Sequence, residues 1–584
     1  MLPAQLEDLF RRSLASFESK DDQEKLDFFA VFFLFCILIV SFLIRYQGIR
    51  FGFPIFIHGS EPIIVNASIN MVRTGDLNPH VFFWSSFFFY LQALIYFFVW
   101  KFGQLFGFFS EFEQIELTTL YFWGRFLTIV LSVGTVYVSY RISRLFIGRL
   151  AGILTAIFVA SSFLLVENAY LIKADTAMMF LIMCSVFFAA RILVRKPRLF
   201  DYVMSGIFLG FAIGTKQSAF LAIFPIVISH LIRVFRGDVK LIGKEILASG
   251  VSVLVAFILV NPYAILDHEL FLSFVEQQRK SYGVTLDGGE RGSSYSWYLA
   301  MLLRKFGIVQ VALAVVGVGV MGIRRPLHAV FLVSVPLAFL MFFGGYPRAY
   351  GRNVLPVIPL LSVFAAFAIV EADRVLTSLA RPGVGMRLAR IGTGALVVVA
   401  LWAAYGQADA AVADAKKKCF PDTRWLSKIW IEENIPPGSS IGRDAGTTPL
   451  GVPRYWKMPH GPKATGGHWY PKLEPGLFIN TYLGGQGFIR KPLDAYDYVI
   501  TNLSPYAKMK RDPRRFEDRI EKYEALFSEL KLIKEFRPKR NESTGPVLRI
   551  YKIGSGDPGG AAEEQLDSGT NNFDRNPGVT HSNR

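Results

Sequence analysis

Long apolar runs recur along the chain, and they restrict its fold more than any other feature. Phe28–Ile44, Ala151–Val166 and Ile391–Tyr405 approach the roughly 20 residues that an α-helix needs to cross the hydrocarbon core of a bilayer. Aromatic residues make up 15% of the chain, a share that suits lipid-facing helices and interfacial belts. The sequence therefore predicts a multi-pass α-helical protein that is integral to a membrane.

Basic residues gather in five loops between these runs, at positions 141–149, 191–198, 233–244, 324–325 and 374–390. The positive-inside rule places such loops in the cytoplasm. We assign the net charge of +17 to these loops first, so we predict membrane lipids and no nucleic acid as partners. Alternation of sides then predicts about eleven crossings, with the N-terminal segment 1–25 cytoplasmic and the C-terminal end extracytoplasmic.

The stretch between the first two predicted spans, residues 46–119, breaks this simple alternation. Both ends of the stretch belong outside, yet it contains the apolar run Val81–Phe109, and one run cannot cross once and return. We predict a re-entrant or juxtamembrane helix near the outer interface. The alternative is an ordinary span, with another span miscounted.

The composition changes beyond Gln407, and a small extracytoplasmic α/β domain is predicted at residues 407–554, after a membrane domain at 26–406. Asp422 is a good N-cap for its first helix. Residues 555–584 have almost no large apolar side chains and are predicted to be disordered. The expected elements are helices at Asp422–Asn434 and Arg514–Leu530 and strands at Ser440–Gly442, Asp497–Ile500 and Val547–Ile553.

Two acidic residues near the outer ends of spans are candidates for chemistry. Glu61 could act as a general base toward an acceptor hydroxyl or amine, or it could be a helix-start residue that favours the helix dipole. Asp175 could hold a divalent metal ion and, through it, a donor phosphate, or it could cap the following helix. His58 and His80 are further candidates to line a site, with ordinary surface histidines as the alternative.

Three cations also lie where the charge rule expects few. Lys216, Arg348 and Arg352 together favour an outward-facing phosphate site, while simple snorkelling to the interface is the alternative for each. The chain has no P-loop, so ATP-driven transport is not supported. The outer side of a membrane has no nucleotide pool. A group transferred there should therefore arrive on a lipid carrier.

The ordered set of motifs resembles the GT-C glycosyltransferases. The closest similarity is to the family-39-like group of dolichyl-phosphate-mannose-protein mannosyltransferases and aminoarabinose transferases. The resemblance covers most of residues 46–440. Its motifs are Glu61, Asn66–Ser68, Met71–His80, Phe89–Leu94, Gly124–Phe126, Lys173–Met178, Gly214–Ser218, Asn261–Tyr263 and Arg348–Pro359.

The resemblance implies a GT-C fold and a function. The acidic residue of the first outer loop, Glu61 here, would be the catalytic base, and the basic residues Lys216, Arg348 and Arg352 would bind the donor phosphate. The sequence departs from the family in two ways. Ser60-Glu61 stands where Asp-Glu or a lone Asp is usual, and the acidic residue of the aminoarabinose type is missing after His80.

These observations predict a glycosyltransferase that works on the outer side of a membrane, with a bacterial inner membrane favoured. Its donor would be a polyprenyl-phosphate sugar and its acceptor a glycan, lipid or protein. Glu61 would deprotonate the acceptor, and a divalent metal ion is a candidate cofactor. The competing class is a non-enzymatic transporter or flippase for a lipid-linked sugar, which would need the cations but no base.

Overall fold

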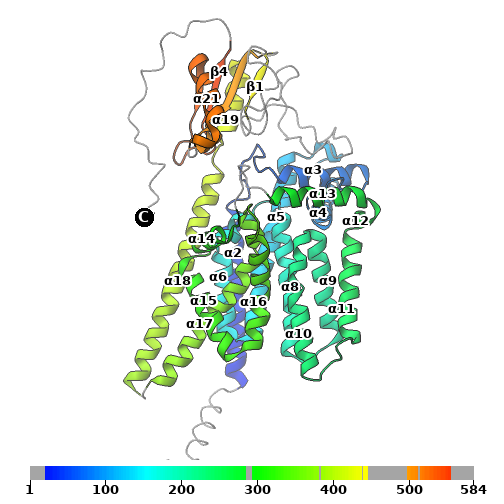
Figure 1. Ribbon diagram of the computed structural model, residues 1–584, viewed down its shortest axis with the longest axis vertical. Helices are drawn as coiled ribbons and strands as arrows, with labels where there is room; N and C mark the ends of the chain where they lie inside the picture. The colour runs from blue at the N-terminus through cyan, green and yellow to red at the C-terminus, as the bar shows by residue number, and fades with distance from the viewer. Residues whose placement is uncertain are drawn as a thin grey trace, which may run out of the picture. The chain divides into compact units, whose positions relative to one another are not determined.

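The computed structural model describes residues 20–283, 292–380, 383–436, 439–444, 496–510 and 513–553. The described residues up to Pro421 form one compact unit, and those from Asp422 onward form a second. Most of the predicted N-terminal segment and the predicted disordered tail lie outside the described residues. The first unit is a bundle of long helices (Figure 1).

Helices of the bundle cover the predicted spans at 28–44, 151–166 and 391–405, and the second of these is divided between two helices. The helices of the bundle are α2 (Lys20–Tyr46), α5 (Leu117–Phe146), α6 (Arg149–Ser161), the short α7 (Phe163–Ala169), α8 (Ala174–Val194), α9 (Leu199–Thr215), α10 (Phe224–Phe235), α11 (Lys244–Val260), α15 (Ile308–Arg324), α16 (Pro326–Gly344), α17 (Val357–Leu379) and α18 (Val384–Lys418). Among the described residues, six helices are long and apolar enough to cross a membrane. The number rises to eight when each of two bent pairs counts as one span. The multi-pass helical fold is confirmed, while the count of eleven crossings stays a prediction.

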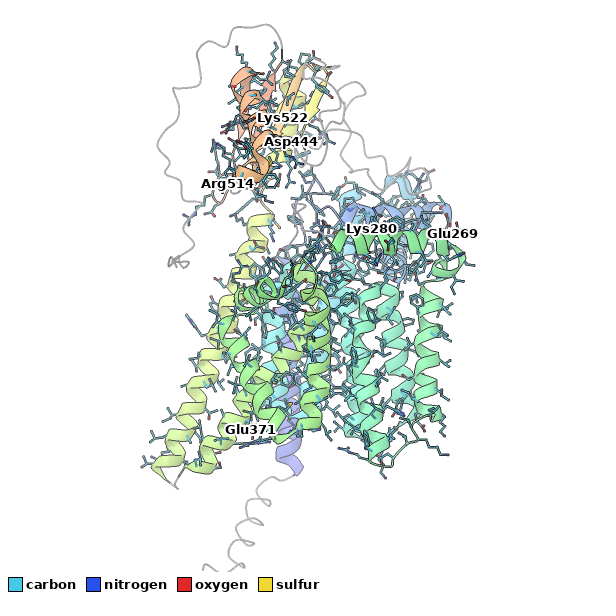
Figure 2. The ribbon with its side chains drawn as sticks, in the orientation of Figure 1. Glu269, Lys280, Glu371, Asp444, Arg514 and Lys522 are labelled. Atoms are coloured by element: carbon cyan, nitrogen blue, oxygen red, sulfur yellow. The ribbon has the colours of Figure 1, made fainter. Side chains whose placement is uncertain are left out.

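A layer of helices lies across one end of α8, α9 and α11 (Figure 1). It contains α3 (Glu61–Thr74), α4 (Phe87–Leu105), the short α12 (Tyr263–Leu266) and α13 (His268–Tyr282). The helix α4 lies within the apolar run Val81–Phe109 and is not among the candidate spans of the described chain. That the run does not cross the membrane stays a prediction. Charged side chains mark both ends of the first unit, with Glu371 at the end of α17 and Glu269 and Lys280 on α13 (Figure 2).

Small residues let α9 and α11 approach each other closely. On α9, a Cβ added at Gly206 or Gly210 would overlap the backbone carbonyls of Ser249 and Val253 on α11. Spacing of small residues by four positions is the usual way in which membrane helices bring their backbones together. This packing fixes where α9 ends, and Lys216 is the residue that follows it.

A break separates α6 from α7, whose axes differ by 58°. A broken helix leaves backbone carbonyls without intrahelical partners, and these must be satisfied inside a bilayer. The fully buried Arg45 supplies the donors. Its guanidinium donates to the carbonyls of Val159 and Ala160 at 3.2 and 2.9 Å, and to the Ser132 hydroxyl at 2.8 Å. Arg45 thereby fixes the start of α7, which carries residues of the candidate site.

The second unit is a small α/β domain, as predicted. Its sheet has the order β1-β2-β4-β3, in which β1 (Ile441–Arg443) is parallel to β2 (Tyr498–Asn502) and the other pairs are antiparallel. Its helices are α19 (Thr423–Asn434), α20 (Leu503–Met509) and α21 (Pro513–Glu529), and β4 (Leu548–Lys552) lies beside β3 (Lys531–Phe536). Asp422 caps α19 by accepting the N–H of Arg424 at 2.9 Å. The sequence did not predict α20 or β3, and the expected domain start at 407 falls inside α18.

Candidate functional site

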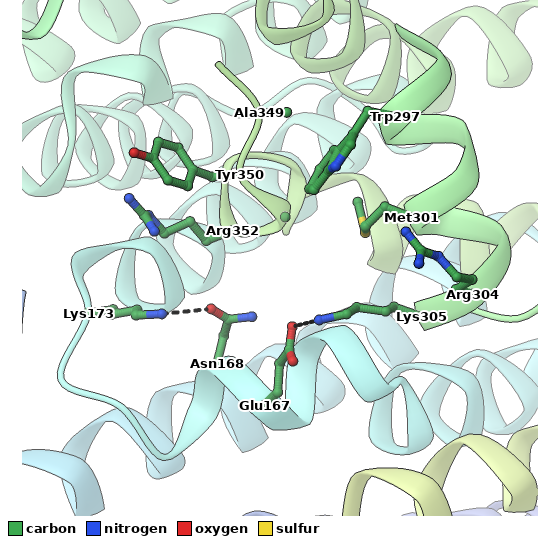
Figure 3. Close-up of a pocket in the computed structure, with 11 residues that line it drawn as sticks. Glu167, Asn168, Lys173, Trp297, Met301, Arg304, Lys305, Ala349, Tyr350 and Arg352 are labelled. Carbon is green, nitrogen blue, oxygen red and sulfur yellow. Dashed lines mark hydrogen bonds and ion pairs between the residues drawn. The ribbon is translucent and has the colours of Figure 1, made fainter. Parts of the chain in front are cut away.

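A cavity of about 430 Å³ opens beside α7, where the chain passes from α7 into α8. Its wall also includes α14 (Tyr295–Lys305) and the turn η3 (Gly351–Val354) with the residues just before it (Figure 3). The wall carries four basic side chains and one carboxylate, a net charge of +3. The lining residues are Glu167, Asn168, Lys173, Trp297, Met301, Arg304, Lys305, Ala349, Tyr350, Gly351 and Arg352.

Lys173 is the most informative of these residues. It directly precedes α8 in extended backbone conformation and is only 7% exposed. Its ammonium donates to the Asn168 amide oxygen at 3.3 Å, and among the described residues it forms no ion pair (Figure 3). Burial, and then the charge of Arg352, lowers the pKa of Lys173 to about 8. A buried cation with only an amide as partner is costly, and an anion in the cavity would remove that cost.

Arg352 is the second cation that faces the cavity. Its side chain is 29% exposed, and its guanidinium lies over the Tyr350 ring at 4.0 Å from the centroid. Contact with a ring restricts the guanidinium, which suits the two parallel hydrogen bonds that arginine forms with a phosphate. Arg304 lies on the opposite wall, and Lys305 is paired there with Glu167.

Asp175 and Lys216, two of the predicted site residues, are brought together as an ion pair. The Lys216 ammonium lies 2.7 Å from Asp175 Oδ1 and 3.4 Å from the Asn353 amide oxygen. Arg352 Nε lies 3.9 Å from the other Asp175 oxygen. The pair joins the start of α8, the end of α9 and the turn η3. It therefore supports the cavity wall from behind, and the charge of Lys216 is already met by Asp175.

The side chains present do not fit a metal-ion site. Both oxygens of Asp175 contact cations, and a metal ion would have to displace them. Within the described part of the chain, no three His, Cys, Asp or Glu side chains form a group that could hold a metal ion.

Glu61 does not have the environment predicted for a general base. It is fully buried, and its two oxygens accept hydrogen bonds from Arg125 at 2.9 and 2.7 Å. The N–H of Ile172 donates to the same carboxylate at 2.9 Å. Arg125 is itself fixed by the carbonyls of Ile49 and Phe51. These contacts link the Glu61 carboxylate at the start of α3 to the segment that carries Lys173 and leave none of it exposed.

The remaining predicted residues are distributed over the first unit. The Nδ1 atom of His58 is 3.1 Å from the Ser60 hydroxyl, in the loop that leads into α3. His80 lies between α3 and α4, with Nε2 2.8 Å from Asp76. Arg348 donates to the Ser281 hydroxyl at the end of α13. His58, His80 and Arg348 are not among the residues that line the cavity.

Sequence reasoning missed most of the cavity wall. Lys173 stands in the segment that was singled out for Asp175, but a sequence does not show which cation finds a carboxylate and which does not. Glu167, Trp297, Arg304 and Lys305 gave no signal, because each belongs to a loop or helix end that is unremarkable by itself. Only Arg352 of the predicted phosphate-binding residues faces the cavity.

Comparisons with known proteins agree with the fold. The pattern of the family described as dolichyl-phosphate-mannose-protein mannosyltransferase matches residues 84–282. The structure is similar to that of ArnT from Cupriavidus metallidurans bound to undecaprenyl phosphate, with a TM-score of 0.52 at 14% identity over 89% of this chain and 98% of that one. The chain has the GT-C fold. The family match over residues 84–282 agrees with the resemblance to the family-39-like group.

Two structures of an archaeal protein show the same fold. The Archaeoglobus fulgidus oligosaccharyltransferase tethered with an acceptor peptide gives a TM-score of 0.54 at 12% identity, over 89% of this chain and 74% of that one. Oligosaccharyltransferase AglB from the same organism, in complex with an inhibitory peptide and a dolichol-phosphate, gives 0.51 at 12% identity, over 83% and 70%. No curated protein sequence matches the chain.

Proposed function

We propose that the protein is a membrane glycosyltransferase that moves a sugar from a polyprenyl-phosphate donor to an acceptor. The observation that carries this proposal is the buried Lys173 ammonium, which faces a cation-lined cavity without a carboxylate partner among the described residues. The GT-C fold supports it, since structures with this fold hold undecaprenyl phosphate and dolichol-phosphate. The positive-inside rule supports transfer on the outer side, and a bacterial inner membrane remains the favoured location.

The cations would act chiefly on the leaving group. A polyprenyl-phosphate sugar carries one negative charge, and breakage of its sugar–phosphate bond leaves a phosphate monoester with a second charge. Lys173 and Arg352 are fixed before the reaction and would stabilise the charge that develops. An interaction that is stronger in the transition state than in the ground state raises the rate. Direct attack by the acceptor from the opposite face would invert the configuration of the sugar.

The test uses the full chain in membranes and a panel of radiolabelled undecaprenyl-phosphate hexoses and pentoses. Transfer of label to a glycan, lipid or protein acceptor is expected for the wild type. Lys173→Met and Arg352→Met should each lose most of it. Lys244→Met is the matched control, because Lys244 is exposed at the start of α11. Movement of labelled lipid across vesicles without any transfer would instead support the transporter class and refute the proposal.

A further inference from the structure

The burial of Glu61 leaves the proposed reaction without its expected proton acceptor. An acceptor hydroxyl must lose a proton as it attacks the sugar, and a general base must reach that proton. The Glu61 carboxylate is fully buried and is held by Arg125 and the N–H of Ile172. The base should instead lie on the wall of the cavity that binds the donor. This inference rests on the proposed function and concerns the group that takes the proton.

Glu167 is the one carboxylate among the residues that line the cavity. The other titratable side chains of the wall are the phenol of Tyr350 and four basic residues. A phenol and an arginine both keep their protons at neutral pH. Lys173, with its pKa lowered to about 8, is mostly protonated at pH 7 and serves as a cation. Of the lining residues, Glu167 therefore has the chemistry of a base.

The last turn of α7 presents this carboxylate with one oxygen held and the other available. Glu167 Oε1 accepts a hydrogen bond from the Lys305 ammonium of α14. Glu167 Oε2 has no hydrogen-bond partner among the described residues. The side chain of Glu167 is 18% exposed, whereas that of Glu61 is 0% exposed. An ion pair at one oxygen thus orients Glu167 and still lets a hydroxyl reach the second oxygen.

Glu167 and the cations proposed to bind the phosphate lie on different sides of the cavity. Figure 3 shows Lys173 and Arg352 on one side and Glu167 with Lys305 toward the other. Asn168, the next residue after Glu167, accepts the hydrogen bond of the Lys173 ammonium at 3.3 Å. An attack that inverts the sugar comes from the face opposite the leaving group. A sugar whose phosphate lies at Lys173 and Arg352 would therefore turn that face toward Glu167.

The charges of the wall favour proton transfer in this direction. Before the reaction, Lys305 meets the charge of Glu167, while Lys173 and Arg352 meet the charge of the donor phosphate. Proton transfer removes a negative charge from the carboxylate, and bond breakage adds one to the phosphate. The total charge is unchanged, and one negative charge has moved to the side of the two cations that no carboxylate of the wall neutralises. Lys305 then faces a neutral acid, which favours release of the proton to water.

We propose that Glu167 Oε2 is the proton acceptor of the transfer reaction. The acceptor O–H bond breaks and its proton passes to Oε2, while the acceptor oxygen forms a bond to the anomeric carbon. The bond from that carbon to the phosphate oxygen breaks, and its electron pair leaves with the polyprenyl phosphate. Release of the proton to water restores the carboxylate for the next turnover.

The test compares Glu167→Gln with the wild type, using the full chain and the labelled donor that the wild type turns over. Gln keeps the size of the side chain and an oxygen for Lys305, but it cannot take the proton. Turnover is expected to fall about 100- to 10,000-fold, with binding of undecaprenyl phosphate unchanged. Glu269→Gln, an exposed change on α13, is the matched control and should turn over donor like the wild type.

Two further variants separate proton acceptance from the ion pair. Lys305→Met removes the same pair but keeps the carboxylate, so its turnover should fall less than about tenfold. Glu167→Asp keeps a carboxylate on a shorter side chain and should turn over donor at least about tenfold faster than Glu167→Gln.

Four results would overturn the inference. They are full turnover by Glu167→Gln, loss of undecaprenyl phosphate binding in that variant, an equal loss of turnover in Lys305→Met, and no advantage of Glu167→Asp over Glu167→Gln. A wild type that binds undecaprenyl phosphate but turns over no donor would overturn the proposed function and this inference with it. These outcomes are distinct, because only the last concerns the wild type.

Discussion

Binding of undecaprenyl phosphate should weaken above about pH 8, because Lys173 loses its proton there. Burial and the nearby Arg352 lower the pKa of this side chain to about 8. Only the ammonium form attracts the phosphate. Each pH unit above 8 should therefore reduce the affinity about tenfold, or about 1.4 kcal/mol. The second pKa of a phosphate monoester is about 6, so the affinity should be greatest between about pH 6 and pH 8.

Two substitutions at Lys173 separate charge from shape. Lys173→Met keeps a long unbranched side chain and removes the ammonium, so the affinity at pH 7 should fall by about 2–5 kcal/mol. The decrease in affinity above pH 8 should disappear as well, because the variant has no ammonium to lose its proton. Lys173→Arg keeps its charge well above pH 8 and should therefore bind better at pH 9 than the wild type does, relative to pH 7.

The same methionine variant should be more stable than the wild type without ligand. The folded-state pKa of about 8 lies below the ordinary value of 10.5, so folding disfavours the charged lysine. This cost is about 3 kcal/mol below pH 8 and vanishes as the pH rises through 10.5, where both states become neutral. Lys173→Met should therefore raise Tm at pH 7, and the gain should shrink at alkaline pH.

Both measurements use the full chain in detergent. Calorimetric titration with undecaprenyl phosphate between pH 5.5 and pH 9.5 gives the affinity, and intrinsic fluorescence gives Tm. Lys244→Met should match the wild type in both. The reasoning fails if wild-type affinity is flat from pH 7 to pH 9.5, or if Lys173→Met binds the lipid phosphate as tightly as the wild type.

Three further predictions concern other parts of the first unit. Glu61→Gln should lower Tm as well as activity, because it leaves the buried Arg125 without its charge partner at a cost of about 3–5 kcal/mol; unchanged Tm would contradict this. Gly317→Ala should destabilise by about 1–3 kcal/mol, since its Cβ would overlap the backbone of α17, whereas Gly319→Ala on the same helix meets nothing and should be neutral in a thermal melt. Transfer should survive EDTA treatment, because cations occupy both oxygens of Asp175; loss that Mg²⁺ restores would contradict it.

Much of the fold could be predicted because helices that insert into a membrane need long apolar runs, which are visible in the local composition. The predicted spans at 28–44, 151–166 and 391–405 all fall on helices, although the second of them is divided between α6 and α7. The elements of the second unit were harder to predict, because its strands and helices are shorter than the helices of the first unit. Half of the residues of β3 are exposed, and three of its six residues, in the sequence KLIKEF, are charged, so the strand was not recognised in the sequence. The end of α18 was also missed, since the helix continues beyond its apolar part.

The site was predictable as a region but not as a set of roles. Glu61, Asp175 and Lys216 were noticed because charged residues are costly beside apolar runs. Their partners could not be read from the sequence, because the Glu61–Arg125 and Asp175–Lys216 pairs join residues 64 and 41 positions apart. Once paired, the first of these carboxylates fixes the loop and the second supports the cavity wall. A charged residue beside an apolar run is therefore as good a candidate for a structural role as for a chemical one.

A structural role can be distinguished from a chemical one by the partner of each charged side chain. Lys216 has Asp175, Arg125 has Glu61, and Lys305 has Glu167, so the protein itself meets these charges. Lys173 has an amide instead, although it is as buried as Lys216. Burial of a cation without an anionic partner costs free energy of folding. An anion that binds Lys173 would remove this cost, and the free energy recovered would add to the affinity for the anion. The search for the lipid phosphate should therefore begin at Lys173 rather than at the more conspicuous ion pairs around it.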